Sequence, residues 1–257
     1  MKISMEILEQ IVRNAGIMFM NRKNAGEISK KGEADFVTEV DMQVQAYVQE
    51  NLRREFPEIQ FMGEEKDNEN VNFLYPTWIL DPVDGTTNLI HDMKCSALSL
   101  ALWNNGNVEL GIIYRPYTDE FFYGEKGKGA FLNGKPIHVS SVENMEECLI
   151  SVGTSPYKKE DAKENFELFK NIFTRCADIR CLGSAALSLA YVACGRMEAY
   201  IEKGLKPWDF AAGLLLLQDA GGTVTNYNGE DICATEISDV VAGNGKIGWK
   251  NLFTLKC

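Results

Sequence analysis

The stretch Trp78-Ile-Leu-Asp-Pro-Val-Asp-Gly-Thr-Thr-Asn88 organises this chain. Its first three residues are apolar and are typical of the end of a buried strand. Two carboxylates, Asp81 and Asp84, follow, and residues 86–88 have the composition of the opening turn of a helix. Paired acids can hold hard divalent cations, and the N–H groups at a helix start can receive a phosphate. The stretch therefore predicts a site for a cation, an anion or both at the end of a strand.

Composition and charge narrow the classes of function. The chain has 257 residues, 45% hydrophobic and 25% charged, which is typical of a soluble protein with a large core. The formal net charge of −11 disfavours nucleic acid as the main ligand, because binding to phosphate backbones depends on Lys and Arg. The longest apolar run, Phe210–Leu217, is too short to span a membrane. The N-terminal residues lack the pattern of a signal peptide, so we expect no membrane partner.

The cysteines and histidines argue against a zinc centre. Seven cysteines are scattered along the chain without a Cys-x-x-Cys pair, and the two histidines are His91 and His138. Zinc sites are built from clustered Cys and His side chains. Scattered thiols are typical of a reducing compartment, so the sequence predicts a cytoplasmic protein with free cysteines.

The first half of the chain combines amphipathic helices with antiparallel strands. Apolar residues at helical spacing predict one helix over 4–22 and another that begins near Asp41. The polar residues 24–34 between them are typical of a loop. Residues 96–140 contain several apolar strands separated by turns, of which Asn133-Gly134 is a typical hairpin signal. We therefore expect an antiparallel sheet in this half.

The second half alternates strands with helices. We expect strands near residues 149–152, 179, 197–201, 223–226 and 240–242, and helices over 160–175, 184–193 and 208–220. Strands and helices mixed in both halves predict a layered α/β fold with two sheets. We treat residues 1–257 as a single catalytic domain, with an N-terminal α+β half of about 1–147 and a C-terminal α/β half of about 148–257.

Other acidic segments have both a structural and a functional interpretation. Asp41 follows Thr38 by three residues, as in a capping box in which Asp replaces Glu. Asp209 lies in the first turn of an apolar helix that starts near Pro207, where a negative charge stabilises the helix N-terminus. The pair Glu64-Glu65 follows a short strand and is locally typical of surface acids. Local sequence leaves both interpretations open for each segment.

Taken together, these segments resemble the inositol monophosphatase family of lithium-sensitive, magnesium-dependent phosphatases. The motifs that carry the resemblance are Asp35-x-Val-Thr-x-x-Asp41, Gly63-Glu-Glu65, Asp81-Pro-Val-Asp-Gly-Thr-Thr-Asn88, Gly183-Ser-Ala-Ala186 and Trp208-Asp-x-Ala-Ala-Gly213. They occur in the family's order and cover about residues 30–245. The resemblance implies an αβαβα sandwich of the sugar-phosphatase type, a homodimer and sensitivity to lithium.

The resemblance also implies a role for each residue of the site. The ligands of two or three Mg²⁺ ions would be oxygen donors: Glu64, Asp81, the carbonyl of Val83, Asp84 and Asp209. The catalytic residues would hold and polarise the attacking water: Asp41 and Thr86, with Glu65 in support. The substrate-binding residues would contact the phosphate or the alcohol: Gly85, Thr86, Thr87, Ser184, Ala185 and Glu202. Mg²⁺ prefers oxygen ligands, and ions a few ångström apart can activate a water and neutralise a leaving alkoxide.

The expected substrate is a small phosphate ester, with inositol 1-phosphate first. Thr87-Asn88 resembles the inositol branch of the family, and Glu202 can accept hydrogen bonds from adjacent hydroxyls. Fructose 1,6-bisphosphate is an alternative that requires a cation for its second phosphate, and Arg180, Lys203 and Lys206 are candidates. Histidinol phosphate, NADP(H) and nucleotide phosphates also stay open, as does a regulatory binding protein on the same fold.

Overall fold

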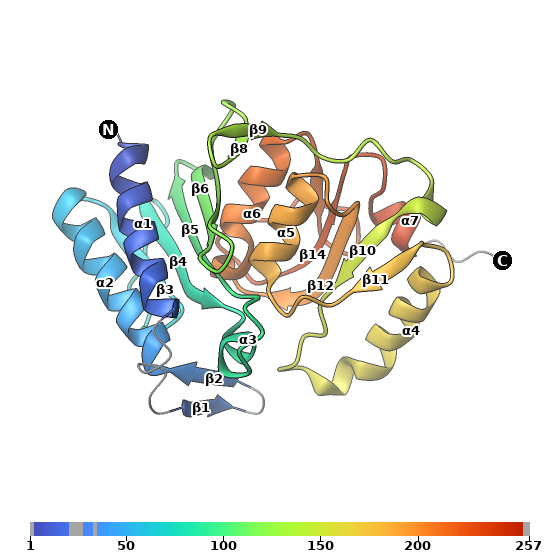
Figure 1. The fold of residues 1–257 in the computed structure, drawn as a ribbon, viewed down its shortest axis with the longest axis horizontal. Helices are drawn as coiled ribbons and strands as arrows, with labels where there is room; N and C mark the ends of the chain where they lie inside the picture. The colour runs from blue at the N-terminus through green and yellow to red at the C-terminus, as the bar shows by residue number, and fades with distance from the viewer. Residues whose placement is uncertain (1–2, 21–27, 33–34, 254–257) are drawn as a thin grey trace.

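Figure 1 shows five stacked layers in the computed structural model, which describes residues 3–20, 28–32 and 35–253. The first layer holds helices α1 (Met5–Met20) and α2 (Glu39–Glu55), and a seven-stranded sheet follows. Helices α5 (Ala185–Ala193) and α6 (Pro207–Asp219) form the middle layer. A five-stranded sheet comes next, and α4 (Ala162–Phe173) covers its outer face together with α7 (Trp249–Phe253). The predicted αβαβα sandwich is confirmed.

The seven-stranded sheet contains the apolar run and the two acids of residues 78–84. Its strands, in spatial order, are β3 (Gln60–Gly63), β4 (Thr77–Asp84), β5 (Ala97–Asn104), β6 (Asn107–Arg115), β7 (Glu120–Glu125), β8 (Ala130–Leu132) and β9 (Lys135–Ile137). All neighbouring strands are antiparallel except β3 and β4. The expected hairpin between β8 and β9 is confirmed, with positive φ at Asn133 (49°) and Gly134 (78°).

The five-stranded sheet mixes parallel and antiparallel pairs. Its strands, in spatial order, are β11 (Asp178–Arg180), β10 (Leu149–Val152), β12 (Ala199–Leu205), β14 (Ser238–Gly243) and β13 (Thr223–Thr225). Strand β10 is parallel to both β11 and β12, and the other pairs are antiparallel. Ile150 and Val152 of β10 pack against Phe169 and Ile172 of α4, which explains the amphipathic pattern of that helix.

The middle layer is apolar on all sides because both of its faces contact a sheet. Every residue of α5 is buried, and so is most of α6. The packing against β6 is close: a Cβ added at Gly111 would lie 2.7 Å from the carbonyl oxygen of Ala212. Buried packing of this density fixes the position of both helices. Their N-termini, at Ala185 and Pro207, are consequently held in place beside the end of β4.

Three local expectations differ from the structure. Residues 24–34 were expected to form a loop, but β1 (Ile28–Gly32) pairs antiparallel with β2 (Asp35–Thr38), so the expectation is wrong for 28–32. Residues 24–27 and 33–34 lie outside the described residues. Strand β4 continues through Asp84 instead of ending near Leu80. Helix α7 was not expected. The boundary between two halves near residue 147 stays a prediction.

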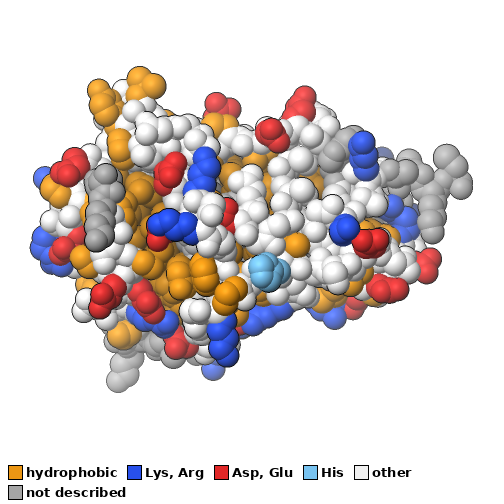
Figure 2. All heavy atoms as spheres, turned by 90° about the horizontal axis from the view of Figure 1, so that it is seen from above, with side chains coloured by type: hydrophobic (Ala, Val, Ile, Leu, Met, Phe, Trp, Pro, Cys, Tyr) orange, Lys and Arg blue, Asp and Glu red, His pale blue; other side chains and the backbone are white. Residues whose placement is uncertain are grey.

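The surface and the helices bear on the kind of partner. On the face shown in Figure 2, acidic and basic side chains are interspersed, without a continuous basic area. Together with the net charge of −11, this face offers little to a nucleic-acid backbone. In the part of the chain that the structure describes, no helix combines the length and apolar character that crossing a membrane requires.

Candidate active site

A cavity of about 310 Å³ lies where the end of β4, helix α3 (Thr86–Ile90), the start of α5 and strand β12 meet. Eleven of the predicted site residues contribute to its lining: Glu64, Asp81, Val83, Asp84, Gly85, Thr86, Thr87, Ser184, Ala185, Glu202 and Asp209. Asp41 and Glu65 are not among the lining residues. Segments that lie up to about half the chain apart in sequence therefore share one cavity.

A β-bulge brings Asp81 and Asp84 to the same side of strand β4. Side chains three residues apart in a regular strand point to opposite faces. Here Asp81 pairs with Ser99 and Asp84 with Ala97, so β4 has one residue more than β5 over this interval. The extra residue restores the common orientation, and it lies at Pro82-Val83, where proline is tolerated in a strand.

The acids of the cavity repel one another. Asp81 is only 2% exposed. Burial raises the pKa of Asp81 well above its ordinary value, and the nearby charges of Glu64, Asp84 and Asp209 raise it further. Burial likewise raises the pKa of Asp209, again with contributions from Glu64 and Asp84. Such a concentration of buried negative charge is costly unless cations or protons neutralise it.

The oxygens of these acids are engaged by protein donors. Among the described residues, no three or more His, Cys, Asp or Glu side chains are arranged so that they could hold a metal ion. The Asp84 carboxylate accepts hydrogen bonds from the Ser184 hydroxyl and from the N–H groups of Ala185 (3.2 Å) and Ala186 (2.8 Å). Burial nevertheless raises the pKa of Asp84 to about 6. The donor types fit Mg²⁺, and the role of each ligand stays a prediction.

Asp41 joins the cavity through Thr86. The Thr86 hydroxyl donates to Asp41 Oδ1 at 2.8 Å and lies 3.1 Å from the carbonyl oxygen of Val83. The other oxygen of Asp41 accepts the Thr38 N–H at 2.8 Å, which confirms that Asp41 caps the start of α2. Asp41 is buried, and burial raises its pKa while the hydrogen bonds from Thr38 and Thr86 oppose the rise.

Glycine is required at the turn into α3. Gly85 has a φ of 93°, a region that side chains rarely adopt. A Cβ at this position would also lie 2.9 Å from the carbonyl oxygen of Gly183, in the turn before α5. The helix begins at Thr86, as predicted, and the N–H groups of a first helical turn have no acceptor within the helix. Thr87 is exposed at the cavity.

Asn88 connects α3 to the turn before α5, a role that sequence reasoning missed. Its side-chain amide donates to the carbonyl oxygens of Cys95 (2.7 Å), Leu182 (2.7 Å) and Gly183 (3.2 Å). The last two partners are more than ninety residues away in the sequence. Asn88 is buried and its partner residues are partly exposed, so these bonds are partly shielded from water. They hold the two halves of the cavity wall together.

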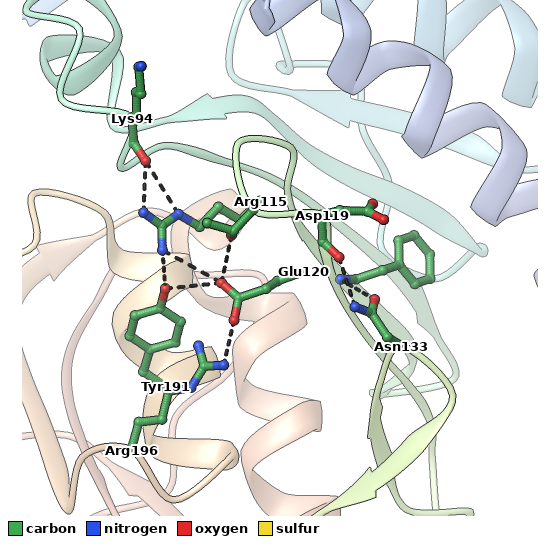
Figure 3. A network of polar contacts seen from close by, with 9 residues as sticks. Lys94, Arg115, Asp119, Glu120, Asn133, Tyr191 and Arg196 are labelled. Atoms are coloured by element: carbon green, nitrogen blue, oxygen red, sulfur yellow. Dashed lines mark hydrogen bonds and ion pairs between the residues drawn. The ribbon is translucent and has the colours of Figure 1, made fainter.

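A second polar network fixes the segment after α3 (Figure 3). The guanidinium of Arg115 donates to the carbonyl oxygen of Lys94 at 2.9 Å and to the hydroxyl of Tyr191 on α5 at 2.5 Å. Glu120 lies between two cations, 2.5 Å from Arg196 and 3.6 Å from Arg115. These contacts join β6, β7 and α5 to the segment after α3.

Glu65 is close to the site without lining it. Its N–H donates to Oε1 of Gln45 at 2.9 Å, and Gln45 also packs where a Cβ of Gly63 would lie. Gln45 was missed because it lies among the core-facing residues of α2 and looks like a packing residue. Two other residues of the lining, Tyr157 and Cys181, were missed because they lie in loops without a motif.

Comparisons with known proteins agree with this fold and with the motifs. The model of the inositol monophosphatase family matches residues 2–254. The Nus factor SuhB of Escherichia coli K12 is 37% identical over 225 residues, 87% of this chain and 84% of that protein. A fructose-1,6-bisphosphatase/inositol-1-monophosphatase of Thermotoga maritima is 36% identical, over 93% of this chain and 90% of that protein.

A solved structure gives the same result. The structure of an IMPase from Thermotoga maritima has a TM-score of 0.86 to this chain and is 35% identical, with 95% of this chain and 94% of that chain covered. The layered fold, the ordered motifs and the cavity that four of the five motifs line have a common explanation: the chain belongs to the inositol monophosphatase family.

Proposed function

We propose that the protein is a Mg²⁺-dependent phosphomonoesterase that hydrolyses a small polyol or sugar phosphate, foremost inositol 1-phosphate, to the free alcohol and phosphate. The observation that carries the proposal is the shared cavity. Five acids line it (Glu64, Asp81, Asp84, Glu202 and Asp209), and the lining residue Thr86 is hydrogen-bonded to Asp41. A pure binding protein has no need for an assembly of buried, mutually repelling carboxylates.

Four of the five acids of the cavity are proposed metal ligands. Glu64, Asp81 and the Val83 carbonyl would hold one ion, and Asp81, Asp84 and Asp209 a second, with Glu64 also beside a third. Bound there, Mg²⁺ supplies Lewis acidity, which lowers the pKa of a water and stabilises the leaving oxygen. The charges of the acids, which now raise one another's pKa, would then be compensated.

Thr86 and Asp41 would position the attacking water and receive its proton. Because the Thr86 hydroxyl donates to Asp41 Oδ1, its lone pairs are available to accept a hydrogen from water. As the water oxygen attacks phosphorus, the bond between phosphorus and the alcohol oxygen breaks. One proton of the water moves to the Thr86 oxygen while the Thr86 proton moves to Asp41, and the leaving alkoxide takes a proton from solvent. Burial, which raises the pKa of Asp41, makes that carboxylate a better proton acceptor than an exposed one. Glu65 would support this arrangement from outside the cavity.

The remaining residues would bind the ester. The backbone N–H groups of Gly85, Thr86 and Thr87 are the proposed phosphate contacts. Ser184 and Ala185, at the start of α5, and Glu202 of β12 form the part of the wall that would contact the alcohol. Ser184 also donates to Asp84, so the wall that would contact the alcohol is linked directly to a proposed metal ligand.

One residue, Lys206, supports fructose 1,6-bisphosphate as a second substrate. Of the three candidate cations, Arg180 pairs with Asp178, and Lys203 lies 3.0 Å from Glu164. The Lys206 ammonium lies 5.2 Å from the ring centre of Trp208 and 6.0 Å from that of Tyr157, which lines the cavity. Lys206 is therefore the proposed partner of a second phosphate.

Replacement of that lysine tests the second substrate. Lys206→Gln should lower kcat/KM for fructose 1,6-bisphosphate by about tenfold more than for inositol 1-phosphate, the loss of one charge-assisted contact. Lys203→Gln is the matched control, because that ammonium is already paired with Glu164. Equal effects of both variants on both esters would refute the assignment of Lys206.

Phosphate release with and without Mg²⁺ tests the proposed function itself. The panel is inositol 1-phosphate, fructose 1,6-bisphosphate, histidinol phosphate, NADP and 3′-phosphoadenosine 5′-phosphate. We expect Mg²⁺-dependent release with the highest kcat/KM for inositol 1-phosphate, and partial inhibition by Li⁺. Absence of Mg²⁺-dependent release from every ester would favour the alternative, a regulatory binding protein on this fold.

Assembly and location belong to the same proposal. We infer a homodimer in the cytoplasm from the family resemblance and from the scattered cysteines. Six cysteines of the described residues are free thiols, as a reducing compartment requires. Size-exclusion chromatography with light scattering would test the dimer, and a monomer at micromolar concentration would contradict it.

A further inference from the structure

Both carboxylate oxygens of Glu202 are held by other groups of the protein. The hydroxyl of Tyr200 donates to Oε2 at 2.5 Å, and the N–H of Ser155 donates to Oε1 at 2.9 Å. Tyr200 and Glu202 are two residues apart on β12, so their side chains lie on the same face of the strand. Ser155 follows the end of β10, the parallel neighbour of β12. Two adjacent strands therefore fix one carboxylate at the cavity.

Gly153 provides the space that this carboxylate occupies. A Cβ at Gly153 would lie 1.9 Å from Oε2 of Glu202, so a larger residue would displace the carboxylate. The backbone φ of Gly153 lies outside the left-handed region, which means that alanine would be compatible with the chain itself. The N–H of Gly153 bonds to the Ile201 carbonyl oxygen at 2.8 Å and fixes its position beside β12. The missing side chain is thus what lets Glu202 lie where it does.

The tyrosine is a rigid donor. Tyr200 is 1% exposed and belongs to the main core cluster, so its ring cannot turn away from Glu202. Its position leaves part of the carboxylate uncommitted. An ionised carboxylate has about four lone-pair sites on two oxygens, and the protein uses one on each oxygen. One site on each oxygen is left for a ligand in the cavity.

We propose that Tyr200, Ser155 and Gly153 are positioning residues that orient Glu202 so that its two oxygens accept hydrogen bonds from two adjacent hydroxyls of the substrate. The inference rests on the proposed function and deepens it. It names the substrate class as phosphate esters whose alcohol carries a vicinal diol, because neighbouring hydroxyls match two oxygens of one carboxylate. Esters without such hydroxyls gain nothing from this orientation.

The test compares two esters in three variants. Inositol 1-phosphate carries adjacent hydroxyls, and phenyl phosphate has none. Tyr200→Phe and Gly153→Ala each disturb Glu202 by a different route, and Tyr114→Phe is the matched control. Tyr114 is also buried and donates to a carboxylate, Asp119 Oδ1 at 3.0 Å.

We expect Tyr200→Phe and Gly153→Ala to raise KM for inositol 1-phosphate about tenfold, the scale of one hydrogen bond to a charged group. The kcat for this ester should change less than about threefold, and kcat/KM for phenyl phosphate likewise. Tyr114→Phe should leave both esters unchanged. Equal loss with both esters, or no loss with either, would overturn the inference.

A binding measurement keeps the inference separate from the proposed function. Isothermal titration calorimetry with inositol 1-phosphate and Ca²⁺ in place of Mg²⁺ does not require turnover. If the wild-type protein releases no phosphate but binds this ester about tenfold more tightly than Tyr200→Phe and Gly153→Ala, the proposed function fails and the inference stands. Equal binding by all variants, or no binding by the wild type, would overturn it.

Discussion

Replacement of Asn88 by alanine tests whether the two walls of the cavity depend on one buried amide. The side chain bridges Cys95, in the segment after α3, and Leu182, in the turn before α5, each at 2.7 Å. Removal of the amide leaves three partly buried carbonyl oxygens, of Cys95, Leu182 and Gly183, without this donor. Each lost bond contributes about 1 kcal/mol net, and a stranded buried acceptor costs about 1–3 kcal/mol. We therefore expect Asn88→Ala to lower the free energy of unfolding by about 2–4 kcal/mol.

Urea unfolding followed by tryptophan fluorescence would measure this loss, with Asn107→Ala as the control. The Asn107 amide is exposed and donates to the Asn105 carbonyl oxygen at 3.1 Å, so its removal should change stability by less than about 0.5 kcal/mol. Because Asn88 belongs to α3, Asn88→Ala should also lower phosphate release. A loss below about 1 kcal/mol with unchanged release would refute the reasoning, since the walls would then be held by other contacts.

Three further predictions concern the cavity, the core and the polar network. Asp81→Ala should lower Mg²⁺-dependent release at least about a hundredfold with an unchanged circular dichroism spectrum, because metal and water positions fail together; near-normal turnover would contradict it. Gly111→Ala should lower the free energy of unfolding by about 1–3 kcal/mol, since its Cβ would lie 2.7 Å from the Ala212 carbonyl oxygen; an unchanged thermal midpoint would contradict it. Burial acts to raise the pKa of Glu120, but hydrogen bonds such as that from Arg196 leave it below its ordinary value of 4.5. The stability that this carboxylate provides, about 1 kcal/mol, is present above that value and is lost as the pH falls through the lower folded pKa. The difference in unfolding free energy between the wild type and Glu120→Gln should disappear in acid, and a difference independent of pH would contradict the assignment.

Sequence periodicity predicted the parts of the fold that depend on burial. Helices α1, α2 and α6 were found because one face or all faces of each contact the core. Strand β1 was missed because Ile28–Gly32 is mostly polar, and its structure comes from pairing with β2, which leaves no apolar pattern. Helix α7 has five residues, too few to establish a helical period.

Like the helices and strands, the site residues were predictable only where the sequence carries a pattern. The motif acids could be grouped in advance because a family pattern relates distant segments, whereas no local rule connects Glu64 with Asp209. Asn88 could not be recognised because its partner Leu182 is 94 residues away. Tyr200 left a signal that was overlooked: it lies two residues before Glu202, and strand alternation puts both on one face.

The sequence left open whether these acids cap helices or belong to a functional site. Their hydrogen bonds indicate that one acid can do both. Asp41 accepts an N–H at the start of α2, Asp84 accepts two at the start of α5, and Asp209 accepts the Lys206 N–H at the start of α6. Each helix N-terminus stabilises negative charge. Because the acids of the cavity repel one another, the helix starts offset part of that repulsion before any cation binds. Capping therefore helps to keep Asp84 and Asp209 together in the cavity and Asp41 beside it, so that the structural role of each acid is compatible with its proposed function.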